Sequence, residues 1–316
     1  MEQKLSFVIP CYRSESSIAK VVEGIGKLMD GYGSDRYEVI LVNDASPDGT
    51  FSAIEKLCKE NGHVTGLNLS KNFGQHSAIM AGLNEATGDI IVCMDDDGQT
   101  PPEEAGKLID EVAAGHDIAM ARYPEKKHGF LRNIGSKLNE SMAKSMIGKP
   151  KHLFLSSFFA MKRYILDQLI RYDFPYPYIT GMLLRTTGDI VNVDINHKER
   201  ETGKSGYSMA KLLSLWFRGF TNFSAKPLRV AIVLGVIIAI IGFGMLVYAF
   251  VVRFTNSNAL DGWASLMAAI VGIGGVILIV LGLVGEYIGR IYMGLNKQPQ
   301  YVVRDKIKND MSDGRK

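Results

Sequence analysis

Three consecutive aspartates, Asp95–Asp97, follow a run of apolar residues in the stretch CMDDDGQTPPEE. Neighbouring carboxylates repel one another and raise each other's pKa unless a positive charge lies among them. Asp95, Asp97 and Gln99 occupy alternate positions, so their side chains could face the same way in an extended segment. Hard divalent cations prefer oxygen ligands, and Mg²⁺ uses one or two carboxylates together with substrate phosphates. The spacing therefore predicts a site for a divalent cation and a diphosphate. The alternative is a solvated acidic turn with its corner at Gly98.

Alternating strands and helices are predicted to position this segment, because apolar runs indicate buried strands and helical spacing of apolar residues indicates helices. The strands are expected at Leu5–Ile9, Tyr37–Val42, Val64–Leu69, Ile90–Met94 and Ile118–Ala121, and the helices from about Ser16, at Ser52–Cys58, at Gln75–Ala86 and at Pro101–Ala114. This alternation is typical of a parallel α/β sheet, whose ligands bind beyond the carboxyl ends of the strands. Tyr12, Asp44 and Lys71 should therefore share one edge with the aspartates.

The composition narrows the class of protein. The chain has 316 residues with 36 basic and 33 acidic side chains, and this formal net charge of +3 does not favour a nucleic-acid-binding protein. Cys11, Cys58 and Cys93 lack metal-ligand spacing, and their small odd number fits a reducing compartment. No GxGxxG follows the first strand and no GxxxxGK[ST] occurs, so both common phosphate-binding loops are missing. The start, MEQKLSFVIP, lacks the pattern of a signal peptide.

Two uncharged apolar stretches follow the α/β region. Val230–Val252 and Trp263–Gly285 each exceed the roughly 20 residues that cross a bilayer as a helix, and the short connection RFTNSNALD would make them a hairpin. The ends nearest the α/β region carry Lys226, Arg229, Arg290, Lys297 and Arg304, whereas the connection carries Arg253 alone. This excess predicts a multi-pass protein of the inner (plasma) membrane, with the N-terminal domain and both termini in the cytoplasm. A buried core helix is the alternative for each stretch.

Residues 205–228 alternate aromatic and aliphatic side chains with Lys211 and Arg218, which predicts an amphipathic helix in the membrane interface. An ordinary core-facing helix is the alternative. Gly272, Gly274 and Gly275 would permit close helix packing between chains, and hence a homo-oligomer. The expected organisation is an α/β domain at 1–204, the interfacial helix at 205–228, the hairpin at 229–290 and a cytoplasmic tail at 291–316.

Several motifs together resemble the family-2 glycosyltransferases of the GT-A type, and most closely the polyprenyl-phosphate glycosyltransferases. FVIPCYRSESSI resembles the family's VIP-x-YNE, VNDASPDGT its DDGSxDGT, LSKNFGQHSAIMAG its LxRNxGxxxAxxxG and MDDDGQTPPE its MDADLQxPPE. HKERETGKSGYS resembles the H-x-x-R-x-x-G-x-S-x-Y stretch, and PLR and GLVGEYIGRIY match the borders of the spans. The likeness covers nearly the whole chain. It implies a Rossmann-like GT-A domain that moves a sugar from a nucleotide-sugar donor, UDP-linked in the bacterial group, to undecaprenyl phosphate or another polyprenyl phosphate of the membrane, for cell-envelope glycan modification.

The resemblance also implies roles for individual residues. It assigns the nucleotide to Pro10, Tyr12, Glu15, Asp44, Lys71, Asn72, Asp95 and Arg122, the phosphates of donor or acceptor to Arg122, Arg200, Lys204 and Ser205, and the ion, Mg²⁺ or Mn²⁺, to Asp97 and Gln99. Asp97 and Arg200 would carry the catalytic step. Simpler alternatives remain, because Asp44 could cap a turn, Lys71 could be a solvated loop lysine, and Arg200 could pair with Glu199 or Glu201.

The chain departs from the family pattern at several positions. Arg13-Ser14 replaces the family's Asn-Glu, so Glu15 comes one position late. Asp96 replaces the usual alanine, and Lys204 precedes the serine that the family's lysine follows.

Ser157 and Phe159 stand where many relatives carry an acid, often proposed as the catalytic base, and an arginine. The missing acid is compatible with activity, because a phosphomonoester with a second pKa of ~6 is mostly dianionic at neutral pH and is its own nucleophile. In-line attack would invert the anomeric configuration.

Three other functions would require different sequence features. A dolichol-phosphate-mannose-synthase-like enzyme would use GDP-mannose. A processive polysaccharide synthase would need a Gln-x-x-Arg-Trp motif, but neither Trp216 nor Trp263 follows an arginine. A non-catalytic membrane scaffold would have no need of the acidic cluster at Asp95–Gln99.

Overall fold

The computed structural model describes residues 3–32, 35–123, 153–196, 263–296 and 298–308, together with separate residues between Val233 and Val251. The chain forms two compact units. Met1–Ser205 and Lys297–Lys316 form the first, here called the α/β unit, and Gly206–Asn296 form the second, the helical unit. The predicted interfacial helix at 205–228 lies outside the described residues.

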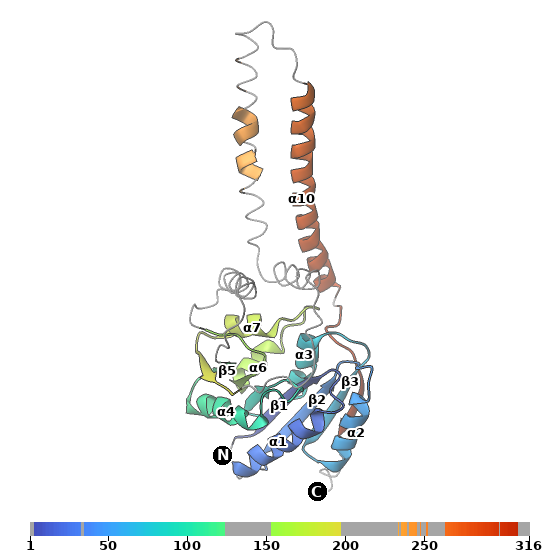
Figure 1. The fold of residues 1–316 in the computed structure, drawn as a ribbon, viewed down its shortest axis with the longest axis vertical. Helices are drawn as coiled ribbons and strands as arrows, with labels where there is room; N and C mark the ends of the chain where they lie inside the picture. Colours follow the sequence, from blue (N-terminus) through green and yellow to red (C-terminus); the bar gives the residue numbers. More distant parts are fainter. Residues whose placement is uncertain are drawn as a thin grey trace. The chain divides into compact units, whose positions relative to one another are not determined.

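The first part of the α/β unit alternates strands and helices in the predicted order (Figure 1). Its elements are β1 (Leu5–Cys11), α1 (Ile18–Gly31), β2 (Tyr37–Asn43), α2 (Thr50–Glu60), β3 (Val64–Leu69), α3 (Gln75–Glu85), β4 (Ile90–Cys93), the 3-10 turn η1 (Pro102–Glu104), α4 (Ala105–Ala114) and β5 (Ile118–Arg122). The later elements are β6 (Phe159–Lys162), α6 (Arg163–Leu169), α7 (Ile179–Thr186), β7 (Ile190–Asp194) and β8 (Val303–Lys308). The sequence did not predict these later strands and helices.

The strands form one mostly parallel sheet in the order β7-β5-β6-β4-β1-β2-β3-β8. β6 runs antiparallel to both β4 and β5, and β8 runs antiparallel to β3. The pairs β1–β2, β1–β4, β2–β3 and β5–β7 are parallel, so the carboxyl ends of these strands meet at one edge. The predicted α/β class with a mostly parallel sheet is confirmed.

β1 continues through Pro10, where the sequence predicted its end. Val8 faces β4, since its carbonyl accepts the Met94 N–H, and Pro10 has the same parity along the strand. β4 pairs with β1 only as far as Val8, so the N–H that Pro10 lacks would meet no strand partner. The proline therefore fits the strand at no cost in ladder hydrogen bonds.

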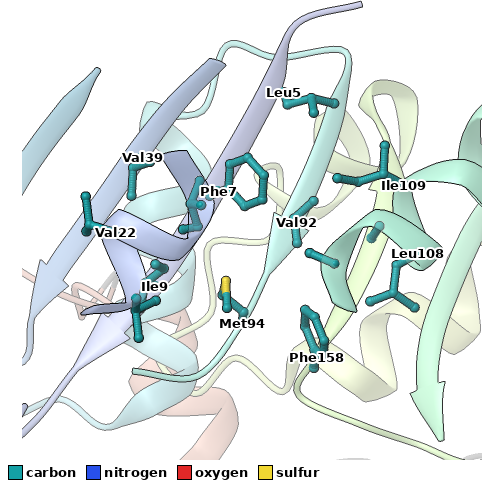
Figure 2. Packing of buried hydrophobic residues seen from close by; sticks show 14 of the residues in the cluster. Leu5, Phe7, Ile9, Val22, Val39, Val92, Met94, Leu108, Ile109 and Phe158 are labelled. Carbon is teal, nitrogen blue, oxygen red and sulfur yellow. The ribbon is translucent and has the colours of Figure 1, made fainter. Parts of the chain in front are cut away.

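Buried apolar side chains cover both faces of the sheet. One cluster packs helices α1, α2 and α4 on one face, and the other packs α3, α6 and α7 on the opposite face. Figure 2 shows part of the first cluster, in which Phe7 and Ile9 of β1 lie among Val22 of α1 and Leu108 of α4. Burying each large aliphatic side chain contributes about 1.5–3 kcal/mol, so the sheet is a firm base for the loops at its edge.

The helical unit contains α10 (Trp263–Leu295), a helix of 33 residues. Among the described residues, one window, Gly272–Gly289, is long and apolar enough to cross a membrane, and none of it is buried. α10 includes the predicted second span and runs past its expected end at Gly285. The described residues of the predicted first span are helical, with a shorter apolar helix at Gly235–Gly244.

The chain returns to the α/β unit after α10 and adds β8 at the edge of the sheet. Thr65 to Leu69 of β3 pair with this strand over Val303–Lys308. Its sequence VRDKIK is mostly charged and exposed, which is common for an edge strand and gave no strand signal. The predicted domain boundaries stay predictions, and the segment expected to be a tail contributes to the sheet.

Candidate functional site

The loops after β1, β2, β3 and β4 carry most of the predicted site residues to the carboxyl edge of the sheet. Pro10 is the next-to-last residue of β1, which ends there at Cys11, and Tyr12 follows with 45% of its surface exposed. Asp44 follows β2, Lys71 and Asn72 follow β3, and Asp95–Asp97 follow β4. The predicted convergence of these loops is present.

Asp44 is almost wholly buried, with 3% of its surface exposed. Its two carboxylate oxygens accept the backbone N–H groups of Phe73 at 2.7 Å and Gly74 at 2.9 Å. Its carbonyl accepts the Asn72 side-chain amide at 3.1 Å. Burial raises the pKa of Asp44, and the two N–H donors act against this rise. Asp44 therefore joins the end of β2 to the loop that begins α3.

Asp95 accepts a hydrogen bond from each of two neutral side chains. The Gln75 amide donates to one carboxylate oxygen at 2.9 Å, and the Ser157 hydroxyl donates to the other at 2.8 Å. Burial raises the pKa of Asp95, the charges of Asp97 and Asp96 raise it further, and the two donors oppose the rise. Ser157, which stands where many relatives carry an acid, therefore acts here as a hydrogen-bond donor to Asp95.

Asp96 points to the loop after β1. Its Oδ2 accepts the backbone N–H of Tyr12 at 2.9 Å and the hydroxyl of Ser14. Between these donors Arg13 has a φ of 60°, and its N–H donates to the Ser46 hydroxyl at 2.8 Å. Asp96 therefore uses its Oδ2 to fix a left-handed turn of the β1 loop.

Asp97 and Gln99 form a compact turn, where the sequence analysis expected an extended segment. Asp97 accepts the backbone N–H of Gln99 at 3.0 Å and its side-chain amide at 2.5 Å. Gly98 supplies the corner with a φ of +66°, which favours glycine. The Asp97 carboxylate is exposed in this turn. Gln99 bonds to it through nitrogen atoms, so the side-chain oxygen of Gln99 takes no part in these two hydrogen bonds. The acidic turn with its corner at Gly98, the alternative given by the sequence, is therefore present, and the binding of an ion by Asp97 and Gln99 stays a prediction.

Glu15 and Arg122 make contacts that the sequence did not predict. Glu15 accepts the N–H of Gly49 at 3.1 Å, where α2 begins, and a Cβ at Gly49 would lie 2.6 Å from its carboxylate. Arg122 makes two hydrogen bonds to Asp194, at 2.6 and 2.9 Å, across the ends of β5 and β7. This pair lowers the pKa of Asp194 through the hydrogen bonds and charge of the guanidinium. In the described part of the chain, no hydrogen bond or ion pair joins Arg122 to Asp95, Asp96 or Asp97.

Lys71 is exposed, and its ammonium lies 5.0 Å from the centre of the Phe73 ring. Arg200, Lys204 and Ser205 lie outside the described residues. Sequence reasoning missed Gln75 and Ser14 as partners of the aspartates. Gln75 occupies a variable position of its motif, and Ser14 departs from the family pattern, so neither carries a sequence signal for this role.

The acidic loop has few partners of opposite charge. Asp95, Asp96 and Asp97 form no ion pair with a lysine or arginine of the described ranges. No group of three or more His, Cys, Asp and Glu side chains with metal-binding geometry occurs in the same ranges. A divalent cation that shares its ligands with a diphosphate needs only one or two carboxylates, so the loop still fits such an ion.

Comparisons with known proteins identify families that match this chain. Residues 6–170 match the family described as glycosyl transferase family 2, and residues 226–291 match the family described as GtrB C-terminal hairpin. The chain is similar to the undecaprenyl-phosphate 4-deoxy-4-formamido-L-arabinose transferases of Proteus mirabilis (strain HI4320) and Enterobacter sp. (strain 638). Each is 33% identical over 304 residues, covering 95% of this chain and 93% of the relative.

One solved structure supports the fold alone. It is the glucosyl-3-phosphoglycerate synthase of Mycobacterium tuberculosis in complex with Mn²⁺ and uridine-diphosphate-glucose. The TM-score is 0.51 at 18% identity, and the match covers 70% of this chain and 77% of that chain.

Proposed function

The chain belongs to glycosyl transferase family 2, and we propose that it transfers a sugar from a UDP-sugar to undecaprenyl phosphate or another polyprenyl phosphate. The observation that carries the proposal is the acidic turn after β4, where the Asp97 carboxylate is exposed and has no ion-pair partner among the described residues. The two similar curated transferases, which share 33% identity over nearly the whole chain, support the acceptor class.

The turn fits a divalent cation, Mg²⁺ or Mn²⁺, by its donor set. An ionised carboxylate has about four lone-pair sites, and Asp97 uses one on each oxygen for Gln99, so sites on both oxygens remain. The Gln99 side-chain oxygen adds a neutral ligand of the kind that hard cations accept. When bound, the ion supplies neutralisation of the negative charge that develops on the leaving diphosphate.

The residues of this chain bind and orient the two substrates. The exposed ring of Tyr12 and the end of β1 at Pro10 would hold the base and ribose, and Lys71 and Asn72 would line the nucleotide. Asp44 gives both oxygens to backbone N–H groups, so it would contact the base through the lone pairs that remain. Its larger contribution is to fix the loop between β3 and α3.

The chemical step needs no protein base. An oxygen of the acceptor phosphate attacks the anomeric carbon, the bond from that carbon to the donor diphosphate breaks, and UDP leaves with the electron pair. The acceptor is already dianionic near neutral pH, so the protein has to position it and offset its charge. We assign this to Arg200, Lys204 and Ser205, with Arg122 at the donor phosphates. In-line attack gives an inverted anomeric product.

The position of β8 supports a paired crossing of the membrane. The chain leaves the α/β unit after Ser205 and returns to it at Lys297. One folded unit lies on one side of a bilayer, so residues 206–296 must cross an even number of times. If α10 crosses once, a second crossing falls within 206–262, as the uncharged stretch 230–252 would provide. The basic flanking residues favour the cytoplasmic side for the α/β unit.

The direct test incubates membranes that contain the protein with undecaprenyl phosphate and a panel of radiolabelled nucleotide sugars, followed by extraction of the glycolipid. We expect a labelled lipid from a UDP-sugar, with an inverted anomeric configuration by NMR. A product from GDP-mannose alone, or retention of configuration, would contradict the proposal. A protein that yields no product and binds no UDP-sugar would be a scaffold that has kept the fold.

A further inference from the structure

Two large aromatic side chains are exposed on the loop between α6 and α7. Phe174 is 51% exposed and Tyr176 is 48% exposed, within the sequence Asp173-Phe174-Pro175-Tyr176-Pro177. We call residues 173–177 the aromatic loop. Exposed apolar side chains that cluster on a folded domain commonly mark an interaction surface. The attachment of the loop and its connection to α10 indicate which partner it would contact.

The ends of the aromatic loop are held firmly. Tyr172 packs against the buried cluster of α3, α6 and α7, and its ring lies 5.6 Å from that of Phe174. At the other end Pro177 is buried, and Tyr178 contacts the ring of His76 edge-on at 5.1 Å. Two prolines restrict the backbone between these points, so the two exposed rings are presented with little freedom left to lose.

The chain that returns from α10 docks beside this loop. The Gln300 side chain donates a hydrogen bond to the Tyr172 carbonyl, at the first residue before the loop. Val302 accepts the N–H of Ser70 at 2.8 Å, and Arg304 donates to the Ser70 carbonyl at 3.0 Å. The return segment therefore joins the base of the aromatic loop to the end of β3, which is part of the candidate site.

Covalent connection limits how far Gln300 can lie from the end of α10. α10 ends at Leu295, and the five residues from there to Gln300 span at most about 18 Å. Arg171 at the base of the loop and Arg304 on the return segment are exposed. Such basic side chains are attracted to anionic headgroups within a short range of a bilayer.

We propose that the aromatic loop inserts Phe174 and Tyr176 into the bilayer interface on the side where α10 ends. This inference rests on the proposed membrane function, and on α10 as a crossing helix. The Tyr176 ring suits the boundary between headgroups and hydrocarbon, because its body is apolar and its hydroxyl can stay hydrated, and the Phe174 ring adds apolar surface to bury. Pro175 and Pro177 have no N–H, so the loop carries fewer backbone donors that would lose water on insertion.

The first test places an environment-sensitive NBD label on single cysteines in the full chain, reconstituted in phosphatidylethanolamine–phosphatidylglycerol nanodiscs. The natural cysteines Cys11, Cys58 and Cys93 are buried, so Phe174→Cys and Tyr176→Cys would be labelled selectively. Lys56→Cys on α2 is the exposed control. We expect lipids with a shallow doxyl quencher to quench the label at 174 and 176 and to spare it at 56.

Leu281→Cys on α10 tests the crossing helix separately from the aromatic loop, because that residue lies in the candidate span and is 58% exposed. Quenching at 281 by a deep doxyl lipid together with no quenching at 174 would overturn the inference and leave the crossing helix in place. No quenching at 281 would contradict the proposed membrane placement, and the inference with it.

The second test asks whether the loop serves the bilayer or a substrate pocket. The double variant Phe174→Ser/Tyr176→Ser should raise the KM for bilayer-embedded undecaprenyl phosphate about tenfold, as expected for loss of buried aromatic surface. The KM for a short water-soluble polyprenyl phosphate should stay unchanged. Tyr164→Ser, an equally exposed tyrosine on α6, is the matched control and should change neither value. Equal increases for both acceptors would place the loop in the acceptor pocket and overturn the inference.

Discussion

The loop after β2 and the loop after β4 leave the same edge of the sheet, and each uses its aspartates differently. Asp44 is 3% exposed, and both of its carboxylate oxygens accept backbone N–H groups of the loop after β3. Asp97 is exposed, and among the described residues it accepts hydrogen bonds only from its own turn. The comparison teaches that the position of an acid at a strand end does not decide its role. Its role depends on how much of its hydrogen-bonding capacity the protein has already used.

The largest effect on activity should come from Asp97, whose carboxylate is exposed. Asp97→Ala should lower kcat by about a hundredfold or more, as removal of a group that offsets transition-state charge does. The melting temperature should change little, because in the described part of the chain Asp97 forms hydrogen bonds with Gln99 alone. Glu103→Ala, an exposed acid in η1, is the control and should keep full activity. Loss of folding in Asp97→Ala would remove the distinction between the two loops.

Substitution of the buried Asp44 should lower the stability of the fold. In Asp44→Asn an amide nitrogen replaces one acceptor and faces the N–H of Phe73 or Gly74, which should cost about 2 kcal/mol of unfolding free energy. Chemical denaturation of the purified protein measures this cost. If the variant kept its stability and lost only nucleotide affinity, Asp44 would be a substrate-binding residue and would not stabilise the loop.

Asp96 should lie between these two extremes. Asp96→Ala removes the acceptor of the Tyr12 N–H and the Ser14 hydroxyl, so the KM for the UDP-sugar should rise a few-fold with little change in kcat. Asp96→Asn keeps one oxygen acceptor and should recover part of the affinity. A fall in kcat as deep as that of Asp97→Ala would indicate that Asp96 binds the ion instead of the loop.

Ser157 should give the smallest effect. Ser157→Ala removes one of two donors to Asp95, and about a twofold to fivefold loss of kcat/KM is expected from one neutral hydrogen bond. Ser157→Asp should be worse than alanine, because a second carboxylate would face Asp95 at hydrogen-bond distance. Steady-state kinetics compare the two variants. Higher activity in Ser157→Asp would mean that an acid at this position acts as a base here too.

The sequence predicted the elements that have a local signal. The strands from β1 to β5 are short buried apolar runs, and the turn residues after β4 carry the acids that the site needs. β6 has four residues inside a longer apolar stretch, and β8 is a charged edge strand that pairs with β3 from the far end of the chain. Neither has a pattern that distinguishes it before the partners are known.

The hydrogen bonds within the site were less accessible to sequence reasoning. Asp44 is satisfied by backbone N–H groups 29 and 30 residues away, and any residue type could supply those donors. The Arg122–Asp194 pair joins two strands that are neighbours only in the folded sheet. Motif spacing therefore identified which residues gather at the edge, whereas the division into closed and open carboxylates required the fold.

The most direct measurement of the central claim is calorimetric titration of UDP into purified wild-type protein and Asp97→Ala, each with and without Mn²⁺. The account predicts that Mn²⁺ tightens UDP binding to the wild type by about tenfold or more, the equivalent of one good charge interaction, and has no such effect on the variant. Equal tightening by Mn²⁺ in both proteins would contradict it, because the ion and the diphosphate would then be held away from the turn after β4.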